Sequence, residues 1–410
     1  MQPIGTDPDP MKYVQPPVSP ALNDPAVRRR LWSRSSTYVG EGYFVCRRLR
    51  YTSQYKEIPD GSSAITSLTV GPAGEVYGAT SGETAHVFVY NPRPPFDAVA
   101  LLAVLDGETD IRRSLVWEKE QTVLCGTRCT GRPSPDWEGG ALYRIAAPGF
   151  YADAVQEWPR GMGQVERLCV PVPGEGIAAL AIDRLRQRLY GLSDRTGTFF
   201  VYDLAAASLD VRRPVDDTWL FSENLMATPD GLVLTAGASG HLVRYDPQTD
   251  LLETTTVQVP SYPGRSLYAR IDSWVYDAAS GRLYVGDKAD GLLYWIDPKT
   301  LETRLLGKPT ARIRIRALTA APDGRIFGMA GQDDDVASMF VYEPATGELR
   351  NLGLPLSCIE EKRYGFNFDS AATGAQGELY FGESERSSRL FVYFPAYKAP
   401  ATCCGNPPTA

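Results

Sequence analysis

The chain has 410 residues and a formal net charge of −7; with 43% apolar and 22% charged residues it is typical of soluble globular proteins. The negative charge argues against nucleic acid or an anionic membrane as the main partner. No apolar stretch approaches the roughly 18 residues that span a bilayer, so no transmembrane segment is expected.

Pro-rich extensions are predicted over residues 1–35 and 396–410. The first residues lack the apolar core of a secretory signal, which indicates a cytoplasmic protein unless the native start has been removed. Within the N-terminal arm, NDPAVRRRLWSRSS offers a cap and Pro25 at a first helical position, so a short basic helix is predicted. This arm either stays solvated or docks onto a partner.

One phrase recurs seven times within residues 36–395. It first reads ITSLTVGPAGEVYGATSGETAHVFVYNP from Ile65, has a degenerate copy over Ser114 to Ala146, and last reads FDSAATGAQGELYFGESERSSRLFVYFP from Phe368. Each copy carries an anchor glycine, about 42 to 65 residues from the next, which is the range of propeller blades. The anchors are Gly78, Gly126, Gly191, Gly237, Gly286, Gly328 and Gly382.

Each copy divides into short strands. An apolar run leads to a turn such as Pro229–Gly231 or Pro322–Gly324, and a second apolar strand ends at the anchor glycine. A third strand alternates, as in His86–Tyr90, and polar β-branched runs such as LLETTTVQV from Leu251 supply an outer fourth strand.

Repeated four-stranded sheets close best into a ring, because a ring leaves few exposed strand edges. We therefore predict an all-β protein, a seven-bladed β-propeller with Pro-rich N- and C-terminal extensions. A strand within Ser36–Leu49 is expected to complete the last blade. A pair of β-sandwiches is the alternative, but it does not explain the even spacing.

No cofactor is predicted, since nucleotide-binding loops, nucleophile elbows and the HExxH pattern are all missing. The seven cysteines form no zinc-ribbon spacing, so no metal site is predicted from them. Buried thiols, with a loose pair at Cys403 and Cys404, are the simplest interpretation.

The candidate binding residues lie where one face of a propeller, the top face, is built. Inner strands begin at that face, and the loops between second and third strands return to it and vary in length, as specificity loops do. The candidates at inner-strand starts are Arg113, Glu223, Asn224, Asp272, Arg316, Asn367 and Asp369, and Trp137 lies in the longest loop.

His86 occupies a slot at the start of a third strand that other blades fill differently. Counted from the Tyr-Asp-Pro frame, the slot holds Ala141, Thr198, His241, Leu292, Ser338 and Arg389. A histidine there is thus not required by the fold, which makes His86, His241 and Arg389 candidates for a top-face site. A hydrogen-bonded rim residue is the more common role of a lone imidazole.

Arg312, Arg314 and Arg316 alternate with two isoleucines, and on a strand they would share one side. Such a row can bind carboxylates, including uronic acids, or it can pair with Asp333, Asp334 and Asp335. The Asp run lacks the alternate spacing of a calcium loop.

The phrases VYGATSGETAHVFVYNP and GELYFGESERSSRLFVY resemble those of seven-bladed propellers among carbohydrate-active proteins, notably the ulvan-type polysaccharide lyases. The resemblance implies that histidine, tyrosine and arginine act together on a uronate, removing the C5 proton and protonating the leaving oxygen. His86 matches the motif position, and in a lyase it would act as a catalytic residue with Tyr268 and with Arg270 or Arg316. Thr198, in the next such slot, cannot replace an imidazole.

Two functions follow from these observations. The favoured one is a non-catalytic propeller that binds a protein or an acidic glycan through its top face, alone or as a subunit of a larger assembly. The alternative is a lyase acting on uronic-acid glycans. They differ in whether His86, a tyrosine and an arginine converge in one top-face pocket.

Overall fold

The computed structural model describes residues 41–48, 60–62, 64–92, 98–148, 162–218, 220–333, 335–359, 363–384 and 389–396. The predicted arm at 1–35 and all but the first residue of the tail at 396–410 lie outside these ranges. Among the described residues, no helix has the length and apolar character needed to cross a membrane.

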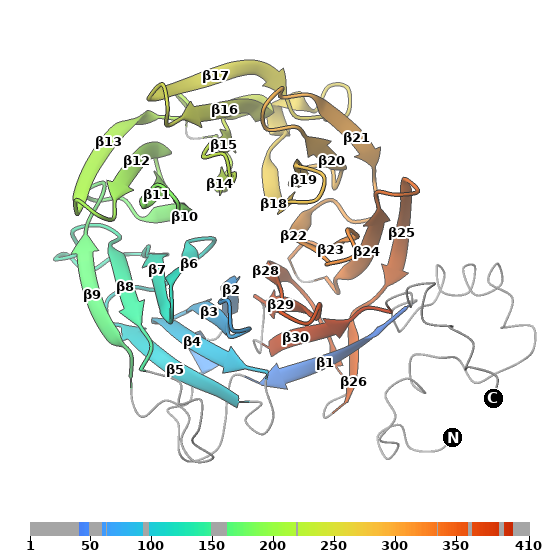
Figure 1. The fold of residues 1–410 in the computed structure, drawn as a ribbon, viewed down its shortest axis with the longest axis horizontal. Coiled ribbons are helices and arrows are strands. Elements are labelled where there is room, and N and C mark those ends of the chain that lie inside the picture. Colours follow the sequence, from blue (N-terminus) through green and yellow to red (C-terminus); the bar gives the residue numbers. More distant parts are fainter. Residues whose placement is uncertain are drawn as a thin grey trace, which may run out of the picture.

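The strands form seven sheets arranged radially around a central axis (Figure 1). The first three blades are β2 (Ala64–Val70), β3 (Val76–Ser81), β4 (Ala85–Asn91) and β5 (Ala98–Leu105); β6 (Leu115–Lys119), β7 (Thr122–Gly126), β8 (Leu142–Ala146) and β9 (Gln164–Cys169); and β10 (Ile177–Asp183), β11 (Arg188–Ser193), β12 (Thr198–Asp203) and β13 (Ser208–Pro214).

The next three blades continue the pattern around the ring. They are β14 (Met226–Ala227), β15 (Val233–Ala236), β16 (His241–Asp246) and β17 (Leu251–Gln258); β18 (Ile271–Asp277), β19 (Arg282–Asp287), β20 (Leu293–Ile296) and β21 (Thr303–Gly307); and β22 (Ile315–Ala320), β23 (Ile326–Ala330), β24 (Ser338–Glu343) and β25 (Glu348–Gly353). Short 3-10 turns are η2 (Asp60–Ser62), η3 (Ala238–Gly240) and η4 (Ser266–Tyr268).

The last blade joins the two ends of the chain. β28 (Phe368–Thr373), β29 (Leu379–Glu383) and β30 (Arg389–Phe394) are completed by β1 (Tyr43–Arg48), which pairs antiparallel with β30. The predicted N-terminal closing strand is thus confirmed, and so is the seven-bladed propeller. β26 (Leu356–Ile359) adds to β1 in parallel and carries β27 (Arg363–Tyr364), giving six strands where the sequence predicted four.

The repeated glycines have a packing reason. Gly78 pairs with Phe88 on the next strand, and a Cβ at Gly78 would overlap the phenylalanine ring. Gly191 stands in the same relation to Phe200. The ring of one strand therefore lies over the bare backbone of its neighbour, and any larger residue would overpack the blade.

The position of the site follows from the order of strands. The first strand of each antiparallel sheet lies innermost, so its start and the loop between the second and third strands are at the same end of the blade (Figure 1). Seven such ends make up the top face, and the inner-strand starts surround the mouth of the central pore.

Candidate functional site

Charged side chains from five blades meet at the pore mouth. They stand at or just before inner strands, or in the loops between second and third strands, as the predicted architecture requires. We call this set the pore cluster: Asp110, Arg112, Arg113, Arg128, Glu223, Asp272, Lys288, Arg314, Arg316, Asp333 and Asp369.

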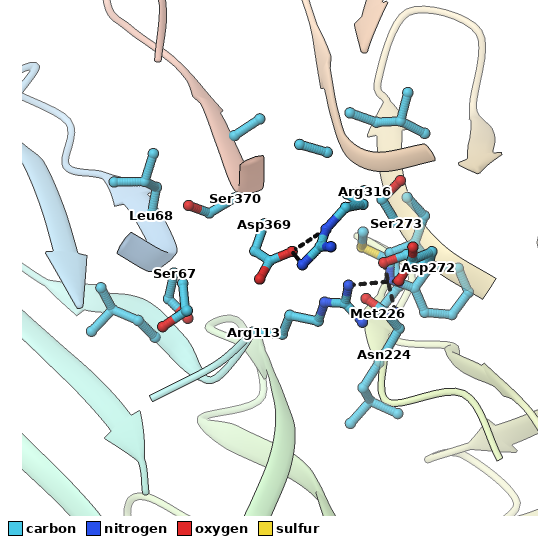
Figure 2. A pocket seen from close by; sticks show the side chains of 17 residues that line it. Ser67, Leu68, Arg113, Asn224, Met226, Asp272, Ser273, Arg316, Asp369 and Ser370 are labelled. Carbon is cyan, nitrogen blue, oxygen red and sulfur yellow. Dashed lines mark hydrogen bonds and ion pairs between the residues drawn. The ribbon is translucent and has the colours of Figure 1, made fainter. Parts of the chain in front are cut away.

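Asp272, on β18, is completely buried and is held by two guanidinium groups. Arg113 Nη2 donates to its Oδ1 at 2.8 Å, and Arg314 Nε donates to its Oδ2 at 2.8 Å. Figure 2 shows Arg113 reaching across to Asp272 from the side of the pore where Ser67 lies. Burial alone would raise the pKa of Asp272, but the charges of Arg113 and Arg314 outweigh it and hold this pKa well below its ordinary value.

Asp369, on β28, makes a second bridge of the same kind. Arg316 Nε and Arg112 Nη1 each donate to it at 2.6 Å, and its carboxylate is fully buried. Burial would raise its pKa too, and the neighbouring arginines again keep the pKa low. Arg316 also pairs with Asp333 on the exposed side at 2.6 Å. Both buried aspartates therefore stay ionised at neutral pH.

A third group of bridges connects the loops around the pore. Arg128 Nε donates to Asp110 at 2.7 Å, and Arg128 Nη1 donates to Glu223 at 3.2 Å. Ser81, on the first blade, donates to Asp110. Because the partners belong to different blades, the cluster fixes the relative positions of the inner strands as well as its own side chains.

Arg113 is held in an unusual backbone conformation. Its φ of 56° lies in the left-handed region, which a residue with a Cβ adopts at a cost. Its N–H donates to Thr66 O at 3.3 Å, and its carbonyl accepts from Leu180 N at 3.1 Å. The inner strands of both neighbouring blades thus hold the backbone that sends the guanidinium across the pore.

The cluster separates two cavities. Above it, a cavity of about 390 Å³ opens on the top face, and below it a channel segment of about 220 Å³ follows the pore. Arg113, Arg316 and Asp369 line both, so they form the floor of the upper cavity (Figure 2). Cations outnumber carboxylates in its walls: Arg112, Arg113, Lys288, Arg314 and Arg316 against Glu223, Asp333 and Asp369.

Five of the candidates proposed from the sequence at inner-strand starts line this upper cavity: Arg113, Glu223, Arg316, Asn367 and Asp369. Arg112 and Lys288 line it as well and were missed. Nothing in the sequence distinguishes Lys288 from other loop lysines, although its loop is one of those predicted for the top face. Arg112 precedes the inner strand next to Arg113, and that proximity was the only available signal.

Asn224 and Asp272 line the channel segment below the cavity, and the other candidates lie apart from both. His241 begins β16 and is partly exposed, and Arg389 begins β30 and is buried. The Trp137 indole N–H donates to the buried Glu108 at 3.3 Å, which anchors the longest top loop to the connection between β5 and β6. None of the three lines the cavity.

The structure does not bring the proposed lyase residues together. His86 is 3% exposed on β4, inside the blade. Burial lowers its pKa, so the imidazole is neutral at neutral pH. Tyr268 and Arg270 precede β18, which lies across the ring from β4 (Figure 1). His86 therefore does not share a pocket with Tyr268 and Arg270.

The arginine row pairs with the Asp run and with more distant acids. Arg312 pairs with Asp335 and Arg316 pairs with Asp333, as one of the two sequence interpretations predicted. Asp334 lies outside the described residues. Within the described part of the chain, no group of three or more histidine, cysteine or acidic residues is placed to hold a metal ion.

Comparisons with known proteins show the fold. No family model matches the chain. A tricorn protease homolog from Saccharolobus solfataricus is 23% identical over 151 residues, which is 36% of this chain and 14% of that protein. The extracellular domain of a hybrid two-component system from B. thetaiotaomicron aligns with a TM-score of 0.56 at 14% identity, covering 88% of this chain and 40% of that one.

A chain of the mitotic checkpoint complex aligns with a TM-score of 0.54 at 14% identity, covering 85% of this chain and 96% of that chain. The chain thus spans well under two thirds of the tricorn homolog and of the two-component protein. These likenesses support a β-propeller, and they do not show the resemblance to ulvan-type lyases.

Proposed function

We propose that this chain is a non-catalytic β-propeller that binds a protein partner through the pore-mouth cavity of its top face. The proposal is supported by the way in which the charged side chains of the cavity walls are held. Their arginines are already fixed by buried carboxylates from other blades, so a partner meets charges that need no reorganisation. Such preorganisation lowers the entropic cost of binding.

The same bridges argue against a catalytic role for the cavity. A general base needs a pKa near the working pH, whereas Asp369 is kept ionised by Arg112 and Arg316. Glu223 is paired with Arg128, and although burial would raise its pKa, the surrounding cations lower it. The acids of the cavity walls therefore serve to position cations.

The likeness to a chain of the mitotic checkpoint complex supports a protein partner, since that propeller is itself part of a protein assembly. The fold is used for many functions, so this support is by analogy only. The stronger support is the polar, open cavity, because propeller loops on a rigid frame commonly present such binding surfaces.

A steric wedge tests the proposal without changing any charge. Ser384→Trp places an indole in the wall of the top cavity, and Ala345→Trp places one in a cavity of about 510 Å³ on the opposite face. Proteins retained from the source organism by the immobilised wild type are identified, and each is purified. Its affinity for the three chains is then measured by calorimetry.

We expect Ser384→Trp to weaken a genuine partner by at least about tenfold, roughly 1.4 kcal/mol, and Ala345→Trp to leave the affinity unchanged. Equal affinity for both variants would contradict the top-face site. The absence of catalysis is tested separately. The wild type is incubated with acidic polysaccharides while the absorbance of unsaturated uronates is followed, and any product would contradict the non-catalytic assignment.

A further inference from the structure

Lys288 is a cation with no direct partner in the pore cluster. It lies in the loop between β19 and β20, where its backbone N–H donates to Arg270 O at 2.9 Å. Its Nζ makes no hydrogen bond or ion pair with any described residue, although it lines the upper cavity. Burial lowers its pKa, and the nearby Asp272 and Glu223 oppose that effect.

The acids near Lys288 are already neutralised by other groups. Asp272 is shared by Arg113 and Arg314, and Glu223 is paired with Arg128. Across the whole pore cluster, six cations face five carboxylates, and Lys288 is the cation left over. This local excess is notable in a chain whose net charge is −7. A buried or half-buried cation is stabilised by an anion, and here the protein supplies none in contact.

Exposed apolar side chains lie in the segments that contact the loop of Lys288. Tyr262, Leu267, Tyr268 and Ile313 are 45%, 54%, 54% and 45% exposed. We call these four residues the apolar rim. Scattered exposed apolar residues need no explanation, but these four belong to two segments that both contact the loop of Lys288.

Contacts to the β19–β20 loop connect the two segments of the apolar rim. Ser261 Oγ donates to Asp290 at 3.0 Å on one side. On the other side Gly291 lies against the backbone of Arg312, where a Cβ would overlap the carbonyl. The loop that carries Lys288 is therefore held between the two segments whose exposed side chains form the apolar rim.

We propose that the top face takes an acidic peptide segment of the partner, with an Asp or Glu side chain paired to Lys288 and adjacent apolar side chains covering the apolar rim. This inference rests on the proposed function and specifies its ligand. Charge complementarity selects the acid, and the aliphatic Leu267 and Ile313 select a peptide, because the hydroxyls of a sugar or the oxygens of a phosphate would not cover them.

A random peptide library displayed on phage tests this chemistry without knowledge of the partner. It is selected in parallel on the wild type, Lys288→Gln, Lys288→Arg, the double variant Leu267→Ser/Tyr268→Ser, and Lys299→Gln. Lys299 is a control on the opposite face of the same blade, where it is exposed and pairs with Asp230 at 2.8 Å.

The wild type, Lys288→Arg and Lys299→Gln are expected to enrich peptides with an acid next to apolar residues at least about tenfold over the unselected library. Lys288→Gln should lose the acid preference, and the double serine variant should lose the apolar preference. A synthetic peptide from the wild-type pool should bind about tenfold more weakly when its acid becomes an amide, and Lys288→Gln should add no further loss, because one interaction is removed by either change.

Absence of acidic enrichment on the wild type, or its persistence on Lys288→Gln, would overturn the inference. Inorganic phosphate or an oligoglucuronate that bound more tightly than the peptide would overturn it in favour of that ligand. None of these results would overturn the proposed function, which fails only if the Ser384→Trp wedge leaves partner binding intact or catalysis is found.

Discussion

Two aspartates of one blade are both completely buried, yet their pKa values are shifted in opposite directions. Asp272, on β18, faces the pore and meets Arg113 and Arg314, which hold its pKa well below the ordinary value against the effect of burial. Asp287, at the end of β19, pairs with no guanidinium group among the described residues, and its hydrogen-bond partners are backbone amides. Burial raises its pKa to about 6, only partly offset by backbone amides that donate to it, Ala289 N at 3.0 Å among them.

The two aspartates differ in whether their partners come from the same blade or from other blades. Asp287 bonds to amides within 17 residues and closes a turn of its own blade, a local task. Asp272 is bound by arginines 159 and 42 residues away, so it connects three blades. Burial is the same at both positions, and the partners decide whether the carboxylate is a turn cap or a bridge of the pore cluster.

The largest effect is expected from removing the bridge. Asp272→Asn leaves two guanidiniums facing each other without a charge between them, which should destabilise the fold by about 3–5 kcal/mol. Chemical denaturation followed by circular dichroism measures this. Glu138→Gln, which breaks an exposed pair with Arg167, is the control and should leave the midpoint unchanged. Equal effects would mean that the pore bridges are no more important than surface pairs.

The pH dependence should follow the same bridge. Since the pKa of Asp272 is lower in the folded state than its ordinary 3.8, its contribution is complete above pH 3.8. The contribution is lost as the pH falls below 3.8 toward the folded pKa, because only the unfolded chain takes up the proton there. Asp369 should act alike. The acid limb of wild-type stability should therefore be steeper than that of Asp272→Asn, and parallel limbs would contradict the bridge.

Arg113 offers a smaller test of how the pore mouth is built. Both Arg113→Ala and Arg113→Gly remove the guanidinium, but only glycine relieves the left-handed backbone. Glycine should therefore be the more stable variant by about 1 kcal/mol, the reverse of its usual disadvantage. Denaturation midpoints of the two variants decide this. Alanine at least as stable as glycine would show that the backbone conformation at Arg113 carries no strain.

The sequence was sufficient for the fold because the fold is built from local, repeated features. The anchor glycines and the strand alternation occur in each blade. Two blades also have a Pro-Asp-Gly turn, in which Gly231 and Gly324 have φ of 92° and 84°, as such turns require. The closing strand was also predicted within Ser36–Leu49, where β1 begins with the apolar run Tyr43–Cys46.

The site was only partly predictable, because its contacts join distant parts of the chain. Arg113, Arg316 and Asn367 could be proposed from their positions at inner-strand starts. The pairing of Arg113 with Asp272 could not, since nothing in one sequence indicates which pore residues face each other. His86 attracted attention because histidine is rare in this chain, and rarity does not predict that its ring is buried.

At neutral pH the smallest effect should come from Asp287→Asn, which tests the comparison from the other side. Burial raises the pKa of Asp287 from 3.8 to about 6. The folded state therefore holds the charged carboxylate at a cost in free energy, and the wild type becomes less stable as the pH rises from about 4 to 6. The variant loses some of the turn's hydrogen bonds, but it also avoids the cost of burying the charge.

Asp287→Asn should be less stable than the wild type by about 1–2 kcal/mol at pH 4.5, where the wild-type carboxyl is mostly protonated, and within about 1 kcal/mol of it at pH 7.5. Denaturation at the two pH values gives the difference. A larger difference in stability between wild type and Asp287→Asn at pH 7.5 than at pH 4.5 would mean that the turn amides stabilise the carboxylate more than burial destabilises it. The pKa values of Asp272 and Asp287 would then be shifted in the same direction, to different extents.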